Sequence, residues 1–452
     1  MFTKKAKHSA ARRSSAAVPI LICGVVALAL AAGGFALASA RHPARAGSGP
    51  VKSRLSSGPT SSTVPATTQP PAPLRVLGIT PKDGAHAVGF GTDVTISFSV
   101  PVANNGVLPT LKPAPPGHWS WASPEELTFR PAGNFAPMSR IRLTLPGGPG
   151  GFASKQGMRL DSTVKSSFAI GGASTLRLQQ LLAELGYLPV RFVPSSAAGQ
   201  TTTQAHLTSA DATLTSSSTK ASDKSVIPPG PPYAGATALE PAPRPQLTTV
   251  YEPASASAIP LTPVPGTFAW RFKDIPASLS DLWAPGKNNT ITTGALMQFE
   301  MAAGLPTDGV AGPKAWSALL RAVAHRWIDR SSYDYVMVNT GSPEYVSLWR
   351  DGAITFKTLA NTGIPEAPTA LGTYPVYARY ITTTMSGTNP DGSHYSDPGI
   401  PWVSYFNGGD ALHGFLRASY GYPQSLGCVE MPYSSAGTIF PYTPIGTLVS
   451  VL

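Results

Sequence analysis

The stretch from His413 to Cys428 reads His-Gly-Phe-Leu-Arg-Ala-Ser-Tyr-Gly-Tyr-Pro-Gln-Ser-Leu-Gly-Cys. It holds one of the chain's two cysteines, and the other, Cys23, lies in an apolar run near the N-terminus. A thiol becomes a strong nucleophile when it loses its proton, and a nearby imidazole is the usual base. We therefore expect His413 and Cys428 to act as a nucleophilic pair. A zinc site would need more His, Cys or acidic ligands than these two.

Short apolar runs separated by turn residues predict a β-rich domain over 330–452, long enough for one core. The strands are expected at 335–339, 345–349, 353–356, 372–378 and 446–452. Between them, Gly, Ser, Asn and Asp dominate 385–398, which predicts a long loop. This loop contains Asp391, His394 and Asp397, so a metal site is one interpretation. A solvated lid over a cleft is the favoured one.

This domain resembles the YkuD family of L,D-transpeptidases. The family signature is a His-Gly followed by Ser-His-Gly-Cys, and here His413-Gly414 precedes Ser425-Leu-Gly-Cys428. The stretches 368–376 and 446–451 resemble two further family elements, and all four occur in family order. Two positions depart from the pattern. Leu426 replaces a second histidine, and Glu430 replaces an arginine.

The resemblance implies a role for each site residue, and the implied chemistry needs neither a metal nor a cofactor. Tyr405 and Phe406 are expected either to line the substrate groove or to pack in the core. The implied roles are nucleophile for Cys428, general base for His413, a carbonyl that orients the imidazole for Gly414, backbone of the oxyanion hole for Gly427, and support for Ser425.

The implied activity is 3-3 cross-linking of peptidoglycan through a cysteine thioester, with release of D-alanine. The expected partners are the stem peptides and glycan of peptidoglycan, and carbapenem-type inhibitors. Two alternatives remain open at this point. In the first, water hydrolyses the thioester, and the protein is an L,D-carboxypeptidase. In the second, the domain is an inactive wall-binding scaffold, and the residues at 426 and 430 are the best argument for it.

Two further modules are expected upstream. Alternating apolar residues and frequent turns over 74–172 predict a β-sandwich that resembles bacterial immunoglobulin-like domains. Amphipathic segments in 173–193 and 263–324 predict three helices that resemble an interrupted peptidoglycan-binding module. The insert at 194–262 is rich in Ser, Thr, Ala and Pro, and we expect most of it to be disordered.

The N-terminal residues predict a membrane anchor. Residues 18–40 carry no charge and would span about 35 Å as a helix, enough for a hydrocarbon core. The basic arm 1–17 is expected to stay in the cytoplasm and the rest to be exported, after a flexible linker over 41–73. A signal peptide cleaved after Ala40, giving a secreted protein, is the alternative.

The chain is therefore expected to be multidomain: a transmembrane helix, an immunoglobulin-like sandwich, a small three-helix module and a β-rich catalytic domain. Its formal charge of +11 does not predict nucleic-acid binding. Nine of the 34 basic residues lie in 1–55 with no acidic residue, so the remainder, with 34 − 9 = 25 basic and 23 acidic residues, has a net charge of only +2.

Overall fold

The computed structural model describes residues 70–195 and 259–452. The predicted basic arm, membrane anchor and linker up to residue 69, and most of the predicted disordered insert, lie outside these residues. Within the described ranges, no helix has the length and apolar character needed to cross a membrane.

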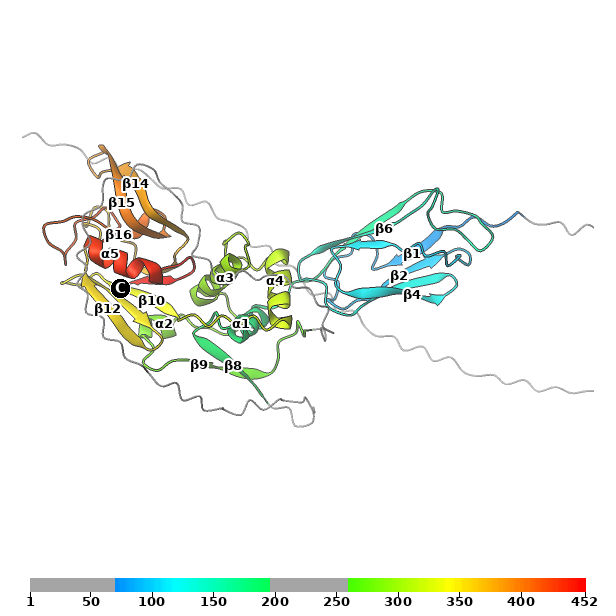
Figure 1. Cartoon of the computed structure of the whole chain (residues 1–452), viewed down its shortest axis with the longest axis horizontal. Coiled ribbons are helices and arrows are strands. Elements are labelled where there is room, and N and C mark those ends of the chain that lie inside the picture. The colour runs from blue at the N-terminus through cyan, green and yellow to red at the C-terminus, as the bar shows by residue number, and fades with distance from the viewer. Residues whose placement is uncertain (1–69, 196–258) are drawn as a thin grey trace, which may run out of the picture. The chain divides into compact units, whose positions relative to one another are not determined.

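Two antiparallel sheets form the first described domain, shown in blue to green in Figure 1. Burial alternates along the inner strands, as in β2, where Val94, Ile96 and Phe98 are buried. The inward residues of both sheets share one core, which confirms the predicted β-sandwich. The sheets comprise β1 (Val76–Thr80), β2 (Val94–Phe98), β5 (Glu126–Pro131) and β4 (Gly117–Ser123), and β3 (Thr110–Lys112), β6 (Arg140–Leu145) and β7 (Val164–Ala169).

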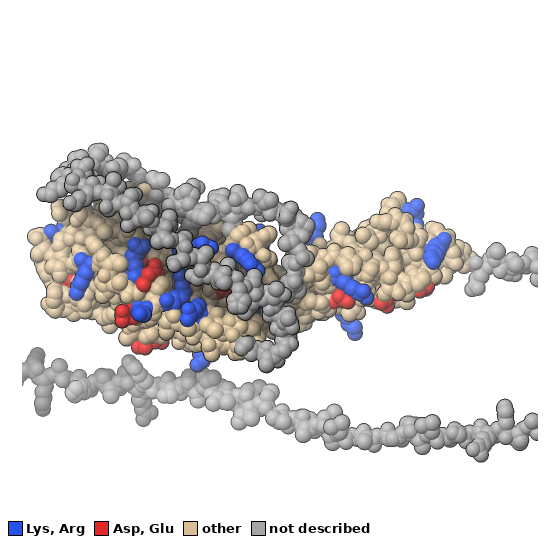
Figure 2. All heavy atoms as spheres, turned by 60° about the horizontal axis from the view of Figure 1, so that its bottom comes forward, with Lys and Arg blue, Asp and Glu red and all other residues tan. Residues whose placement is uncertain are grey.

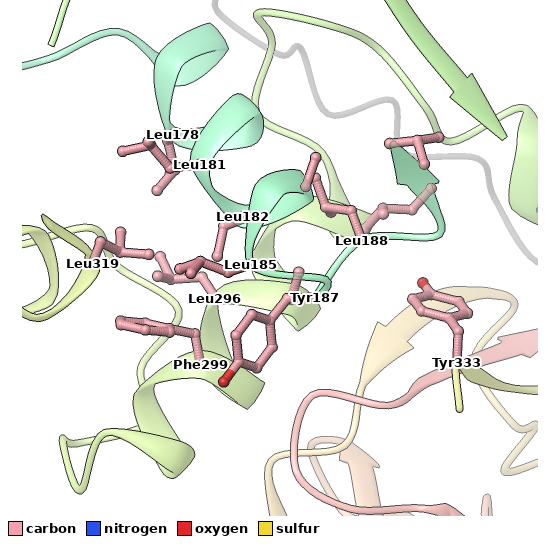
Figure 3. Packing of buried hydrophobic residues seen from close by; sticks show 14 of the residues in the cluster. Leu178, Leu181, Leu182, Leu185, Tyr187, Leu188, Leu296, Phe299, Leu319 and Tyr333 are labelled. Carbon is pink, nitrogen blue, oxygen red and sulfur yellow. The ribbon is translucent and has the colours of Figure 1, made fainter. Parts of the chain in front are cut away.

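A helical module follows, built from α1 (Thr175–Glu184), α2 (Ala277–Ser280), α3 (Thr290–Ala302) and α4 (Pro313–Ala324). The Ser174 hydroxyl caps α1, the Asn289 side chain caps α3, and a proline opens α4. Leucines and aromatic residues of α1, α3 and α4 pack into one cluster (Figure 3). The antiparallel pair β8 (Val190–Pro194) and β9 (Gly266–Trp270) joins the two sides of the insert, so the module is continuous in space.

The C-terminal domain has two sheets around a core of its own. A helix, α5 (Tyr433–Ile439), and a short turn of 3-10 helix, η1 (Phe440–Tyr442), complete it (Figure 1). The five-stranded sheet orders β12 (Ala353–Leu359), β11 (Tyr345–Arg350), β10 (Asp334–Asn339), β18 (Leu448–Val451) and β13 (Gly372–Pro375), and the four-stranded sheet orders β14 (Ala378–Thr388), β15 (His394–Asn407), β16 (Asp410–Gly414) and β17 (Val429–Met431).

The central strands of the five-stranded sheet, β11, β10 and β18, are buried on both faces. In β10, Val336 and Val338 belong to the core between the sheets, whereas Tyr335 packs in the cluster of the helical module. The period of two places successive side chains on opposite faces. This sheet therefore packs against the helical cluster on one face. On its other face it packs against the core that it shares with the four-stranded sheet.

The prediction of a long loop over 385–398 is wrong. β14 and β15 form a long antiparallel hairpin, paired from Ala378 with Tyr405 to Thr388 with His394, with a shift of register between Thr383 and Met385. Only the residues between Thr388 and His394 form the turn. The outer part of the hairpin is exposed or half-buried, so its sequence lacks the apolar alternation that marks a strand with one buried face.

Positive and negative side chains are mixed on the surface of the described residues. On the face shown in Figure 2, Lys and Arg lie among Asp and Glu over the described residues. Some form direct pairs, such as Arg350 with Asp334 at 2.7 Å. The described basic side chains are thus not gathered into a single patch on this face.

Candidate active site

Strand order brings His413 and Cys428 to one cavity. β16 and β17 are parallel neighbours, with Leu412 opposite Val429 and His413 opposite Glu430. Cys428 directly precedes β17, so the loop between the two strands returns it to the side of β16. Both residues line a cavity of about 310 Å³. Its wall also includes Leu426 and residues of the β14–β15 hairpin.

His413 is buried, with 3% of its surface exposed. Its Nδ1 lies 3.0 Å from the carbonyl oxygen of Gly414. A proton on Nδ1 donated to this carbonyl leaves Nε2 as the basic nitrogen. Burial lowers the pKa of His413, although the Gly414 carbonyl and the Glu430 carboxylate act in the opposite direction. The imidazole is therefore neutral near pH 7, the form that accepts a proton.

Cys428 is half-buried, and its Sγ donates to the carbonyl of Gly409 at 3.5 Å. Burial, together with the carboxylates of Asp410 and Glu430, raises the pKa of the thiol to about 12. Among the described contacts, no hydrogen bond joins Cys428 to His413. The resting pair is thus a neutral thiol beside a neutral imidazole, and the proton moves only when the sulfur attacks.

The loop before Cys428 is held by its own polar groups. Ser425 is buried, and its hydroxyl donates to the carbonyl of Cys428 while its N–H donates to Thr362. Gly427 has φ of +110°, which favours glycine. A Cβ there would lie 2.5 Å from Oδ1 of Asp410. Backbone conformation and space therefore both require glycine next to the cysteine.

Family comparisons match both β-rich domains. Residues 333–451 match the model described as L,D-transpeptidase catalytic domain, YkuD. The C-terminal domain is of the YkuD type. Residues 52–146 match the model described as bacterial Ig domain. No curated protein matches this chain.

Solved structures of L,D-transpeptidases are similar to this chain. One from Mycobacterium smegmatis is 12% identical, covers 84% of this chain and 100% of its own, and has a TM-score of 0.25. L,D-transpeptidase 3 from Mycobacterium tuberculosis is also 12% identical, covers 83% and 98%, and has a TM-score of 0.25. The E. faecium catalytic domain is 25% identical, covers 27% and 100%, and has a TM-score of 0.25.

Glu430 faces the cavity of the YkuD-type domain, but its charge is compensated. The Arg417 guanidinium donates through Nε and Nη2 to both carboxylate oxygens of Glu430, each at 2.8 Å. Glu430 is buried, and the Arg417 side chain is 31% exposed. This bidentate geometry is the strong form of the pair. The negative charge of Glu430, one of the two departures from the family pattern, is therefore offset by an arginine thirteen residues earlier.

The two residues predicted to line the substrate groove, Tyr405 and Phe406, are absent from the cavity wall. Phe406 packs in the core between the sheets. Tyr405 packs beside Cys428 in a small cluster, and burial together with the thiol raises its pKa to about 12. Neither lines the cavity. Within the described residues, no group of His, Cys, Asp and Glu that could hold a metal is found.

Two site residues were missed from sequence. Asp410 approaches Gly427 and Cys428, and its Oδ2 accepts from the N–H of Ala370 at 3.3 Å. Burial raises the pKa of Asp410. Nothing in the Asn-Gly-Gly-Asp stretch marks it, because its proximity to the thiol depends on strand pairing. Arg417 carries a signal, since it is the only cation between His413 and Cys428.

Proposed function

We propose that this chain is a cysteine-dependent L,D-transpeptidase that forms 3-3 cross-links in peptidoglycan. The observation that carries the proposal is the cavity in which Cys428 and a neutral His413 stand together, inside a domain of the YkuD type. A 310 Å³ cavity suits a short peptide segment. Anchorage in the cytoplasmic membrane through residues 18–40, and a wall-side location of the rest, belong to the same proposal.

The first half-reaction forms the thioester. Nε2 of His413 takes the thiol proton as Sγ of Cys428 attacks the carbonyl carbon before the terminal D-alanine of a tetrapeptide stem. Backbone N–H groups at Gly427 and Cys428 stabilise the oxyanion, where one donor contributes roughly 10²–10³ in rate. The C–N bond then breaks, and the imidazolium gives its proton to the leaving amine of D-alanine.

The second half-reaction resolves the thioester. An amine of a neighbouring stem attacks the same carbonyl, the C–S bond breaks, and the thiol is restored. With water as the acceptor, the product is a shortened stem, and the protein is an L,D-carboxypeptidase. A non-catalytic wall-binding scaffold is the third candidate. The Arg417–Glu430 pair weakens that candidate, because it neutralises the charge that favoured it.

Intact-mass spectrometry of the full chain in detergent tests the proposal. After incubation with a carbapenem, the wild-type protein should gain one drug-sized mass, and Cys428→Ala should gain none. Muropeptide analysis then separates 3-3 dimers from shortened stems. If neither a carbapenem nor a small alkylating agent modifies Cys428, the transpeptidase proposal is wrong and the scaffold is the better interpretation.

A further inference from the structure

The cavity beside Cys428 contains one negative charge that is not compensated. Three formally charged side chains line it, from Asp397, Arg417 and Glu430. Arg417 and Glu430 neutralise each other through two hydrogen bonds. Among the described residues, no side-chain hydrogen bond or ion pair within the defining distances involves the Asp397 carboxylate. With His413 neutral and the thiol protonated, the cavity has a net charge of −1.

Asp397 lies on β15 within electrostatic reach of His413 and Arg417. It is half-buried and pairs across the hairpin with Met385, which lines the same cavity. Its carboxylate raises the pKa of both His413 and Arg417. A half-buried carboxylate attracts a cation more strongly than an exposed one, because water screens it less.

We propose that Asp397 binds the ammonium group of the acyl acceptor and thereby favours an amine over water at the thioester. The inference rests on the proposed transpeptidase function and names the residue that selects its second substrate. Water has no net charge, so it gains a hydrogen bond from this carboxylate but no charge–charge attraction. An ammonium group gains a partner beside the reacting carbonyl, which raises its local concentration.

The step balances as follows in atoms and protons. The bound ammonium loses one proton to solvent and becomes a neutral amine. Its nitrogen attacks the thioester carbonyl, and a C–N bond forms while the second proton passes to Nε2 of His413. The C–S bond then breaks, and the imidazolium returns that proton to the sulfur of Cys428. The products are an amide and the free thiol.

The test measures how the acyl-enzyme divides between two products. The full chain in detergent receives a disaccharide-tetrapeptide that ends in D-alanine as donor and glycinamide as acceptor. Mass spectrometry quantifies the tripeptide-glycinamide amide and the hydrolysed tripeptide over a range of glycinamide concentrations. Both products arise from one acyl-enzyme, so their ratio does not depend on how fast that intermediate forms.

Asp397→Asn should lower the amide-to-tripeptide ratio about five-fold and raise the apparent KM for glycinamide by the same factor, as expected for loss of one ion pair. Asp397→Glu, which keeps the charge, should retain most of the wild-type ratio. Asp391→Asn is the matched control. Asp391 lies at the tip of the same hairpin, is fully exposed, and contacts Ser393 rather than the cavity. It should leave the ratio unchanged.

Several results would overturn the inference. An unchanged ratio in Asp397→Asn would show that Asp397 does not recognise the amine. An equal fall in Asp391→Asn would assign the effect to the general charge of the hairpin. Tripeptide alone from the wild-type protein, at every glycinamide concentration, would make the protein a carboxypeptidase. If the wild-type protein releases no D-alanine, the proposed function fails, and the inference fails with it.

Discussion

At Cys428, burial and the neighbouring charges act in the same direction. Burial, Asp410 and Glu430 all raise the pKa of the thiol. At His413 they oppose each other, and burial prevails, so the pKa is lowered. The pair therefore differs from a preformed thiolate–imidazolium ion pair. At rest only a small fraction of Cys428 is thiolate, so the attack of its sulfur depends on transfer of the thiol proton to His413.

The first prediction concerns the pH dependence of alkylation at Cys428. Because its pKa is raised to about 12, only a small fraction is thiolate at pH 7. The rate of modification by iodoacetamide should rise about ten-fold per pH unit from pH 7 to 10 without levelling. In the urea-unfolded protein the same rate should level near pH 9. A plateau below pH 8 in the folded protein would indicate an ion pair instead.

The second prediction concerns Arg417 and Glu430. Arg417→Met leaves the buried carboxylate of Glu430 without its partner. Removing one member of a buried ion pair is strongly destabilising, and partial exposure of Arg417 reduces the effect to about 2 kcal/mol in the free energy of unfolding. Adding Glu430→Gln should restore about half of the loss. Urea denaturation measures both variants, and equal stability of Arg417→Met and wild type would contradict the prediction.

At the scale of elements, the loop between β16 and β17 sets the position of the nucleophile. Ser425 fixes its backbone, and Gly427 allows the chain to pass Asp410. In the helical module, α3 carries Glu300. Glu300 is buried and accepts the N–H of Gly309 at 2.9 Å. Each of these elements leads to a separate prediction.

Gly427→Ala should lower carbapenem acylation about 100-fold, since a shift near 1 Å at a nucleophile has effects of that size. Its Cβ would meet Asp410 at 2.5 Å. Gly392→Ala is the control. Gly392 also has positive φ, +86°, but a Cβ there meets nothing within 4 Å. The control should acylate within two-fold of wild type, and similar rates for both variants would contradict a steric role for Asp410.

Glu300→Gln should stabilise the protein at pH 8 but not at pH 5. Burial raises the pKa of Glu300 to about 7. The folded state then binds more protons than the unfolded state between the unfolded pKa and 7, so stability falls as pH rises through this window and stays low above it. Glutamine keeps the acceptor without the charge. We expect a gain of about 2 kcal/mol at pH 8 from urea denaturation, and equal gains at both pH values would refute this origin.

At the scale of the whole molecule, the proposal places a wall enzyme at the end of a chain of modules. The sandwich and the helical module each have their own buried cluster, and the sheet of the YkuD-type domain packs on the helical cluster. Tyr335 and Trp349 make that contact from the sheet. The helical module and the YkuD-type domain therefore share buried apolar surface, which favours cooperative folding of the two.

The last prediction concerns residues 18–40 as an uncleaved anchor. The full chain should sediment with membranes and resist extraction by carbonate, whereas a chain without residues 1–40 should remain in the supernatant. Amino-terminal sequencing of the mature protein distinguishes the alternative. A mature chain beginning at Arg41 would show that the segment is a cleaved signal peptide.

Local sequence was enough for much of the fold. The alternation in Val94–Phe98 and the apolar run in Asp334–Asn339 predicted strands, and the leucines of Thr175–Glu184 predicted a helix. The first and last patterns reflect one buried face, and the apolar run reflects burial on both faces. The β14–β15 hairpin could not be predicted in this way. Its outer strands bury neither face fully, so cross-strand hydrogen bonds rather than an apolar face define them.

By itself, the sequence was enough to predict the pair of His413 and Cys428, with Ser425 and Gly427 between them. Only the tertiary structure decided the charges around that pair. Arg417 meets Glu430, and Asp410 meets Gly427, because parallel pairing of β16 with β17 and the return of the loop bring these groups together. Electrostatic interactions depend on distance and burial, which residue spacing along the chain does not specify.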